Sequence, residues 1–328
     1  MKNLVKILKI TIFLVAIILL VVILKNGFDS KELKSLMLTA NPAYIIFGMF
    51  IVSLGVILKG KRLQILARQF DIKNTLPESI KIQCITIVFA LITPGRAGEF
   101  TKIFLLAKDR KDLIPATTLI CIFERLLDVL ILVFMSLALC FFSFKDQQMI
   151  YLLIFSSFGL LAMIIVLLKI DIIIKKFERF LPKKIQNIVV DFSSNKEKLL
   201  KKTHIISAYS FVIWCLDGLF QYFLLMSVGT ISILPIVIGI NAIVSIMSIL
   251  TILPMGLGTM DLSALFLYDK LLALPKEKIV FLLASARLFG ILTLLLMILP
   301  VFISQKDFIF NLYRDMVNKR KSSGNITP

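Results

Sequence analysis

Long apolar stretches separated by short basic segments organise this chain, and one of them is interrupted. Between the apolar residues 82–92 and 103–107 lies a polar stretch, 93–102, that contains proline, glycine, arginine and glutamate. Proline and glycine break helices, and a charge inside lipid is costly. A similar interruption occurs at 253–261. The pattern therefore predicts a membrane protein built around two broken elements.

The remaining apolar stretches predict helices in a bilayer, which a helix crosses in about 20 residues. They are 10–24, 44–58, 117–144, 149–168, 205–228, 231–253, 262–274 and 279–303. We expect an all-α membrane protein, a multi-pass helical bundle, with one integral membrane domain at 1–303. Basic residues favour the cytoplasmic side of a membrane. We therefore predict cytoplasmic loops at 59–81 and 169–204, a basic cytoplasmic tail at 304–328, and both termini inside the cell.

The interrupted stretches predict two hairpins. Residues 82–92 would extend only about 16 Å as a helix, against a hydrocarbon core of about 30 Å. Basic residues flank both arms, so we expect a re-entrant hairpin from the cytoplasm with 94–99 at its tip. With both termini inside, residues 231–274 form a second hairpin from the outside. The alternative is two ordinary spans, at 231–253 and 262–274.

An ordered internal match suggests an inverted repeat, as in many transporters. Each half has a proline, a glycine four positions later, an acid, and then an arginine in a membrane segment. The matched residues are Pro94, Gly98, Glu99 and Arg125 in the first half and Pro254, Gly258, Asp261 and Arg287 in the second.

Composition narrows the possible functions. The apolar fraction of 59% exceeds the roughly 45–50% of soluble domains. The net charge of +18 lies in the segments between apolar stretches, which argues for a membrane surface and against nucleic acid. The four cysteines form no metal-binding or disulfide pattern, and His204 is the only histidine. We find no nucleotide-binding motif, and we expect neither a metal nor a cofactor.

Candidate functional residues are those whose chemistry is unusual for a membrane segment. Ionisable side chains inside a membrane mark functional sites, and glycine lets a ligand approach the backbone closely. The candidates are Pro94, Gly95, Arg96, Gly98, Glu99, Lys102, Glu124, Arg125, Asp128, Asp217, Pro254, Gly256, Gly258, Asp261 and Arg287.

Two interpretations apply to the charges of residues 117–144. Glu124 and Asp128 share one helix face, and Arg125 can reach Asp128. Arg125 and Asp128 could form an ion pair that holds neighbouring helices together. Alternatively, Arg125 or Arg96 could bind a lipid phosphate, because the planar guanidinium forms bidentate bonds to phosphate.

Helical spacing also predicts two polar faces. Trp214, Asp217 and Gln221 share one face of their segment. In the following segment a second polar face carries Asn241, Ser245 and Ser248.

Three motifs resemble those of the lysylphosphatidylglycerol synthase transmembrane-region family, which is flippase-like. They are Pro94-Gly95-Arg96-Ala97-Gly98-Glu99 with Lys102, Glu124-Arg125-Leu126-Leu127-Asp128, and Pro254-Met255-Gly256-Leu257-Gly258 with Asp261. Met255 replaces a family glycine, and Asp261 stands where the family usually has glutamate. The resemblance covers nearly the whole chain and implies lipid translocation. Larger relatives also carry a C-terminal synthase domain, which we do not expect here.

These observations lead to one preferred function and two alternatives. We expect a transporter of the cytoplasmic membrane that moves a phospholipid or lipid-linked headgroup between leaflets, with membrane lipids as its partners. The chain could instead be a membrane subunit of a lipid-modifying aminoacyl- or glycosyltransferase system, although no catalytic motif supports an enzyme. It could also dock a separate synthase on its basic loop at 169–202.

Overall fold

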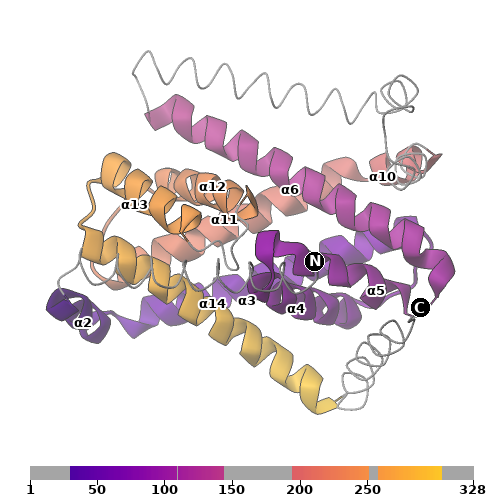
Figure 1. The fold of residues 1–328 in the computed structure, drawn as a ribbon, viewed down its shortest axis with the longest axis horizontal. Helices are drawn as coiled ribbons and strands as arrows, with labels where there is room; N and C mark the ends of the chain where they lie inside the picture. The colour runs from indigo at the N-terminus through magenta and orange to yellow at the C-terminus, as the bar shows by residue number, and fades with distance from the viewer. Residues whose placement is uncertain (1–29, 109, 144–193, 251–257, 305–328) are drawn as a thin grey trace, which may run out of the picture.

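A computed structural model describes residues 30–108, 110–143, 194–250 and 258–304, and in these ranges the chain is helical without strands (Figure 1). The predicted spans at 10–24 and 149–168, Pro254, Gly256 and the tail lie outside the described residues. The elements are α2 (Ser30–Thr39), α3 (Pro42–Gln69), α4 (Leu76–Ile92), η1 (Pro94–Phe100), α5 (Thr101–Ala107), η2 (Lys111–Leu113), α6 (Ile114–Ser143), α10 (Lys196–Leu200), α11 (Thr203–Ser227), α12 (Leu234–Leu250), α13 (Thr259–Leu272) and α14 (Lys276–Ser304).

Three of the described helices are long and apolar enough to cross a bilayer, namely Pro42–Gln69, Thr203–Ser227 and Lys276–Leu299. The fold class predicted from the sequence is therefore confirmed. The apolar core has two main clusters. One joins α3, α4, α5 and α6, and the other lies mainly among α11, α12, α13 and α14. Each cluster includes one of the two predicted hairpins.

The end of α3 differs from the prediction. We expected a span at 44–58 followed by a cytoplasmic loop, but the helix continues to Gln69. Beyond residue 58 the helix still has an apolar face, because Leu63, Leu66 and Ala67 are fully buried. Lys59 and Arg62 therefore lie inside the helix bundle and do not belong to a loop.

The first broken element is a hairpin whose two arms match in length. Helix α4 has 17 residues, or about 25 Å. The returning arm consists of η1 and α5, with 7 residues each, which together span about 25 Å. Lys108 at the end of this arm pairs with Glu78 at the start of α4, at 2.9 Å. Both arms therefore begin and end at the same face of the bundle, as predicted.

The second hairpin is formed by α12 and α13, and its tip at 251–257 lies outside the described residues. Lys278, in the first turn of α14, donates to Thr230, just before α12, at 3.0 Å. Both arms thus meet at one end of the bundle. Helix α13 has 14 residues and extends about 21 Å. This length favours a re-entrant arm over an ordinary span.

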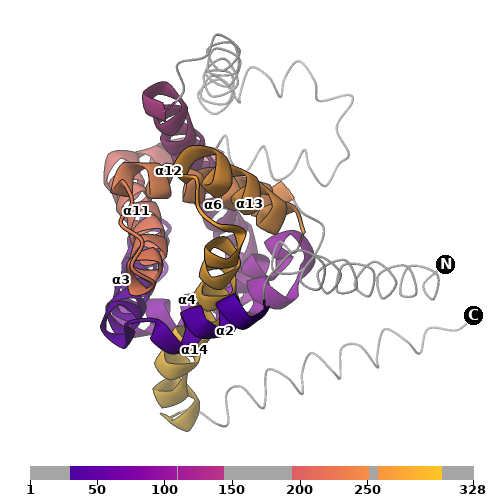
Figure 2. The ribbon, with the colours of Figure 1, turned by 90° about the vertical axis from the view of Figure 1, so that its left-hand side faces the viewer.

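The two hairpins start from opposite ends of the bundle. Helix α3 packs along α11, and the Asn41 N–H at its start donates to the Ser227 carbonyl at the end of α11, at 2.8 Å. The second hairpin begins near this end, whereas the first begins after the other end of α3. Figure 1 shows the α13–α14 connection beside α2 at the left and α5 and α10 at the right. Figure 2 shows α3, α11, α12 and α14 arranged around a common centre.

This arrangement predicts the outcome of a labelling experiment. In a background without native cysteines, Lys73→Cys and Lys276→Cys are expected to react with a membrane-impermeant maleimide from opposite sides. Both side chains are exposed, and they lie at the bases of different hairpins. Lys108→Cys should react from the same side as Lys73→Cys. If Lys73→Cys and Lys276→Cys both reacted from the same side of the membrane, the inverted arrangement would be contradicted.

Candidate functional site

A network of buried charges joins the first hairpin to α3 and α6. At its centre is Arg62, whose side chain is only 1% exposed. Its guanidinium contacts Glu124 and Asp128 of α6, each at 2.5 Å. It also donates to the Ser210 hydroxyl of α11 at 2.5 Å. Three segments distant in sequence are thereby connected through one arginine.

The carboxylate of Glu124 is fully supplied with donors. Lys102 of α5 contacts its second oxygen at 2.5 Å, and Gln83 of α4 donates to its first at 3.3 Å. Glu124 and Lys102 are both buried. Because their charges are paired and hydrogen-bonded inside the protein, we assign these two residues to holding the hairpin in place.

Arg125 extends the network toward the hairpin tip. It forms ion pairs with Glu99 of η1 and with Asp128, the latter at 3.3 Å. Glu99 also pairs with the Nε atom of Arg96 at 3.0 Å. Of the two interpretations considered for Arg125, this geometry favours the ion pair that holds helices together. The network ends at Arg96, whose side chain is 27% exposed.

The backbone at the hairpin tip is held in a costly conformation. Arg96 has φ 55°, in the left-handed region that side chains other than glycine rarely adopt. Such strain costs of the order of 1 kcal/mol and persists only where surrounding contacts impose it. Here Gly98 lies directly against the backbone of Phe89 and Ala90 in α4. The Gly98 N–H also donates to the Thr93 hydroxyl at 2.6 Å.

The second hairpin repeats the central feature of the first. Asp261 at the start of α13 accepts from Arg287 of α14 at 2.6 Å and from the Gly258 N–H at 3.1 Å. Arg287 follows Asp261 by 26 positions, and the same interval separates Glu99 from Arg125. Equivalent carboxylates at the two hairpins therefore hold equivalent arginines, as an inverted repeat requires.

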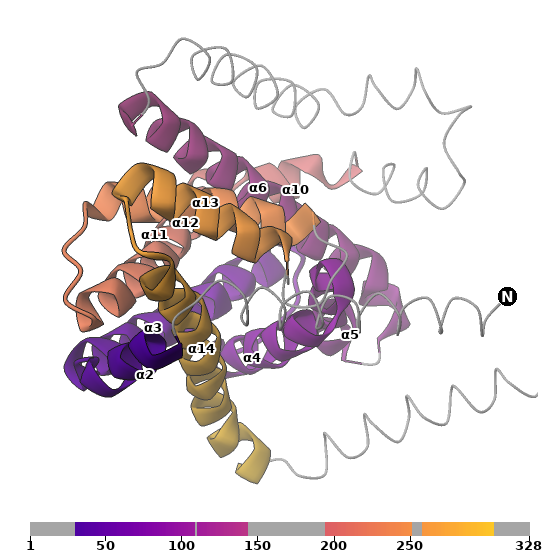
Figure 3. The ribbon, with the colours of Figure 1, turned by 60° about the vertical axis from the view of Figure 1, so that its left-hand side comes forward.

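A cavity of about 220 Å³ lies between the two halves. Helices α3, α4, α11, α12, α13 and α14 contribute to its lining, together with η1. Among the described residues, three cationic side chains line it, Lys59, Arg96 and Arg287, alongside one carboxylate, Asp217. Figure 3 shows α14 crossing the bundle beside α3 and α4.

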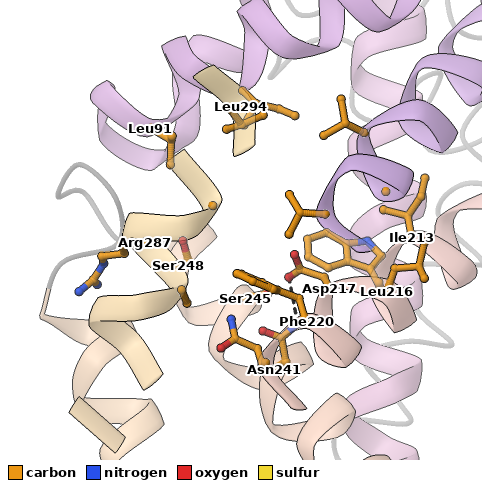
Figure 4. A pocket seen from close by; sticks show the side chains of 18 of the residues that line it. Leu91, Ile213, Leu216, Asp217, Phe220, Asn241, Ser245, Ser248, Arg287 and Leu294 are labelled. Atoms are coloured by element: carbon orange, nitrogen blue, oxygen red, sulfur yellow. Dashed lines mark hydrogen bonds between the residues drawn. The ribbon is translucent and has the colours of Figure 1, made fainter. Parts of the chain in front are cut away.

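The lining of the cavity is divided into polar and apolar parts. In Figure 4, Asp217, Asn241 and Ser245 lie near one another, while Leu91 and Leu294 lie at the opposite end. Asn241 donates to Asp217 at 3.0 Å. This division suits a molecule with a polar head and an apolar body.

Lys59 lies at the polar part of the cavity. Its ammonium stands 5.9 Å from the centre of the Trp214 ring, and Trp214 in turn donates to Asp128 at 3.3 Å. Within the described residues Lys59 forms no ion pair, unlike Arg96 and Arg287. It is therefore the cavity cation most available to an anionic ligand.

The predicted site residues separate into two groups. Both predicted polar faces line the cavity, as do Arg96 and Arg287. The others with described side chains hold the hairpins: Gly98, Glu99, Lys102, Glu124, Arg125, Asp128 and Asp261. Pro94 and Gly95 begin η1, and Gly258 precedes α13.

Two residues of the candidate site are not among those predicted from sequence, Lys59 and Arg62. Both follow a long apolar run and precede further basic residues, so they were assigned to a loop. The signal that could have identified them is the apolar spacing of Leu63, Leu66 and Ala67, which continues the helix past them.

No group of three metal-ligating side chains occurs in the part of the chain that the structure describes. Outside the membrane-embedded helices, the hydrogen bond from Arg110 holds the pKa of the Asp112 carboxyl below its usual range. This pair lies on the exposed connection between α5 and α6, away from the cavity.

Comparison with known proteins agrees with this architecture. Residues 6–300 match the model of the family described as lysylphosphatidylglycerol synthase TM region. No curated protein and no solved structure matches the chain. The family match spans both hairpins, the buried charge network and every residue of the cavity. The chain is thus a membrane protein that belongs to the lysylphosphatidylglycerol synthase TM region family.

Proposed function

We propose that this protein is a flippase-like transporter that moves a phospholipid or lipid-linked headgroup between the leaflets of the cytoplasmic membrane. One observation carries the proposal. The cavity between the two hairpins holds Lys59 without an ion-pair partner among the described residues, with Arg96 and Arg287 also in its lining. Phosphate is the charge that all membrane phospholipids share, and it is the natural counter-ion for these cations.

The chemistry of the cavity fits such a ligand. Lysine binds phosphate as a point charge, whereas arginine offers several donors from one plane. Away from bulk water these interactions strengthen, because the effective dielectric constant falls. The apolar end of the cavity, with Leu91 and Leu294, can shield the start of a hydrocarbon chain.

The inverted hairpins offer a route for movement between leaflets. In transporters with inverted repeats, the site lies at the repeat interface, and small rotations of one half against the other open it to alternate sides. Here the cavity lies between the halves, and each hairpin is anchored within its own half by a carboxylate and an arginine. We expect the end of the bundle with Lys73 and Lys108 to face the cytoplasm.

An enzymatic role receives less support from the geometry. The carboxylates Glu99, Glu124 and Asp261 each have an arginine or lysine partner, and Asp217 accepts from Asn241. A catalytic acid or base must be able to exchange protons with its substrate. We therefore place these carboxylates in structural and binding roles. Docking of a separate lipid-modifying enzyme remains compatible with the same fold.

The test is a leaflet-resolved lipid assay in proteoliposomes. Lys59→Gln removes the unpaired cation but keeps much of the side-chain volume. A hydrogen bond to a charged group contributes about 1.5–3 kcal/mol, so we expect phospholipid movement to slow by roughly 10- to 100-fold. The matched control is Lys61→Gln, because Lys61 donates to Gln64 at 3.2 Å, forms no ion pair within the described residues and does not line the cavity.

Two results would count against the proposal. If the wild-type protein moved no phospholipid class, its role as a lipid transporter would be wrong. If Lys59→Gln moved lipid as fast as Lys61→Gln, the cavity would not be the pathway. Thermal unfolding of both variants should match the wild type, which would show that any difference in rate does not come from misfolding.

A further inference from the structure

The glycines of the membrane helices fall into two structural classes. The first class would place an added Cβ atom against a neighbouring helix or hairpin arm, and its members are Gly48, Gly60, Gly98, Gly218 and Gly239. These residues allow close packing, which is the usual role of glycine in membrane bundles. At Gly55 and Gly290, an added Cβ atom would meet no atom within 4 Å. Packing therefore does not explain these two glycines.

Helix stability does not explain them either. Both lie in the interior of long helices, α3 and α14, where alanine is intrinsically preferred to glycine. Neither has the positive φ that would require glycine. Gly55 is nevertheless buried, so the empty space beside it is enclosed by the protein. Neither helix packing nor backbone conformation therefore requires glycine at these two positions.

Both glycines line the cavity, and each lies one helical turn from one of its cations. Gly55 precedes Lys59 by four positions on α3, and Gly290 follows Arg287 by three on α14. Residues at these spacings share a helix face. The apolar side chains Val52 and Leu294 also line the cavity, one on each of these helices. Unfilled space bordered by apolar groups therefore adjoins the cationic part of the cavity.

We propose that the space beside Gly55 and Gly290 is a subsite for the glycerol backbone and first chain carbons of a phospholipid whose phosphate is bound at Lys59. This inference rests on the proposed function and makes it more specific. The ligand is a whole phosphate-bearing amphiphile with part of its apolar body inside the protein. A water-soluble phosphate compound would leave the subsite empty and bind more weakly.

Trp214 makes this subsite directly measurable. It is the single tryptophan of the chain, and it lines the cavity beside Lys59. The protein in detergent micelles is titrated with dihexanoyl phosphatidylglycerol and, separately, with its deacylated product glycerophosphoglycerol, while tryptophan fluorescence is recorded. Each buried methylene favours binding by about 4-fold. We expect the wild type to bind the short-chain lipid at least ~10-fold more tightly than the deacylated compound.

Substitutions at the two glycines separate the subsite from the phosphate site. Gly55→Leu and Gly290→Leu should each fill the space and weaken binding of the short-chain lipid by roughly 10-fold, the gain expected from a few buried methylenes. Affinity for glycerophosphoglycerol should change by less than about 2-fold, because the cations remain. The control Ala284→Leu adds an isopropyl group at an exposed position of α14 and should alter neither affinity. Gly55→Ala should unfold at a temperature no lower than the wild type.

Each remaining outcome would overturn the subsite. If the wild type bound both probes with equal affinity, the acyl chains of the lipid would contribute nothing to binding. Equal weakening of both probes in Gly55→Leu would show that the substitution disturbs the phosphate site instead. If neither probe altered the fluorescence of the wild type, the subsite and the proposed lipid site would both be wrong. Binding that did not depend on the acyl chains would overturn the subsite but not the proposed lipid site.

Discussion

Replacing Arg62 with alanine is expected to lower the free energy of unfolding by about 3–5 kcal/mol, because it deprives two buried carboxylates of a charged partner. The Arg62 guanidinium donates to Glu124 and to Asp128, each at 2.5 Å. Glu124 is 0% exposed, so it has no contact with bulk water in the folded protein. Thermal unfolding of the purified protein in detergent would measure the loss.

A matched control lies on the same helix. Arg68 is exposed and forms no ion pair within the described residues, so Arg68→Ala should change stability by less than about 0.5 kcal/mol. Adding Asp128→Asn to Arg62→Ala should restore part of the loss, because it removes the carboxylate that lost Arg62 while Glu124 still pairs with Lys102 and Arg125 still pairs with Glu99. Equal stability of Arg62→Ala and Arg68→Ala would show that the network contributes little to the fold.

The buried network shows what sequence patterns can and cannot reveal. The spacing of Glu124, Arg125 and Asp128 correctly indicated a shared helix face and an ion pair within α6. The partners of Glu124 could not be predicted, because Arg62 and Lys102 come from segments 62 and 22 positions away. Such contacts depend on how helices cross in space. A hydropathy pattern describes one segment at a time.

Periodicity was more successful for the cavity. Trp214, Asp217 and Gln221 were predicted to share a face, and all three line the cavity. The same holds for Asn241, Ser245 and Ser248 of α12. A polar face on an otherwise apolar membrane helix must point away from lipid, so spacing alone determines its direction. Lys59 was not predicted to line the cavity, because a cation at the end of an apolar run usually marks the membrane boundary.

The broken elements were also found from sequence, although their detailed shape was not. Proline and glycine predicted an interruption at residues 94–99, but not that η1 would run back along α4. That path depends on the contact of Gly98 with the α4 backbone. The internal repeat became clearer in the structure, where the acid and arginine of each half pair at the same interval. The halves also differ. Arg287 belongs to the cavity lining, whereas its counterpart Arg125 lies in the buried network and Arg96 lines the cavity in the first half.

Gly98→Ala is expected to detach the returning arm of the first hairpin from α4 and to abolish most lipid movement. The new Cβ atom would overlap the Phe89 carbonyl group and the Ala90 nitrogen, which are backbone atoms and cannot rotate aside. Overpacking of this kind costs about 1–3 kcal/mol, and we expect a value near the upper limit. Moving η1 also displaces Glu99, so Arg125 and Arg96 lose a shared partner. Thermal unfolding and the proteoliposome assay would record the two effects.

The control is the same substitution at a glycine whose Cβ atom would have free space. Gly290 lines the cavity, and a Cβ atom added there would meet no atom within 4 Å. Gly290→Ala should therefore not lower stability. The comparison separates loss of glycine flexibility, common to both variants, from the steric overlap at Gly98 alone. Gly98→Ala with wild-type stability and lipid movement would show that the hairpin can shift away from α4 without cost. In that case the strained conformation of Arg96 could not be attributed to this contact, because the arm would be free to relax.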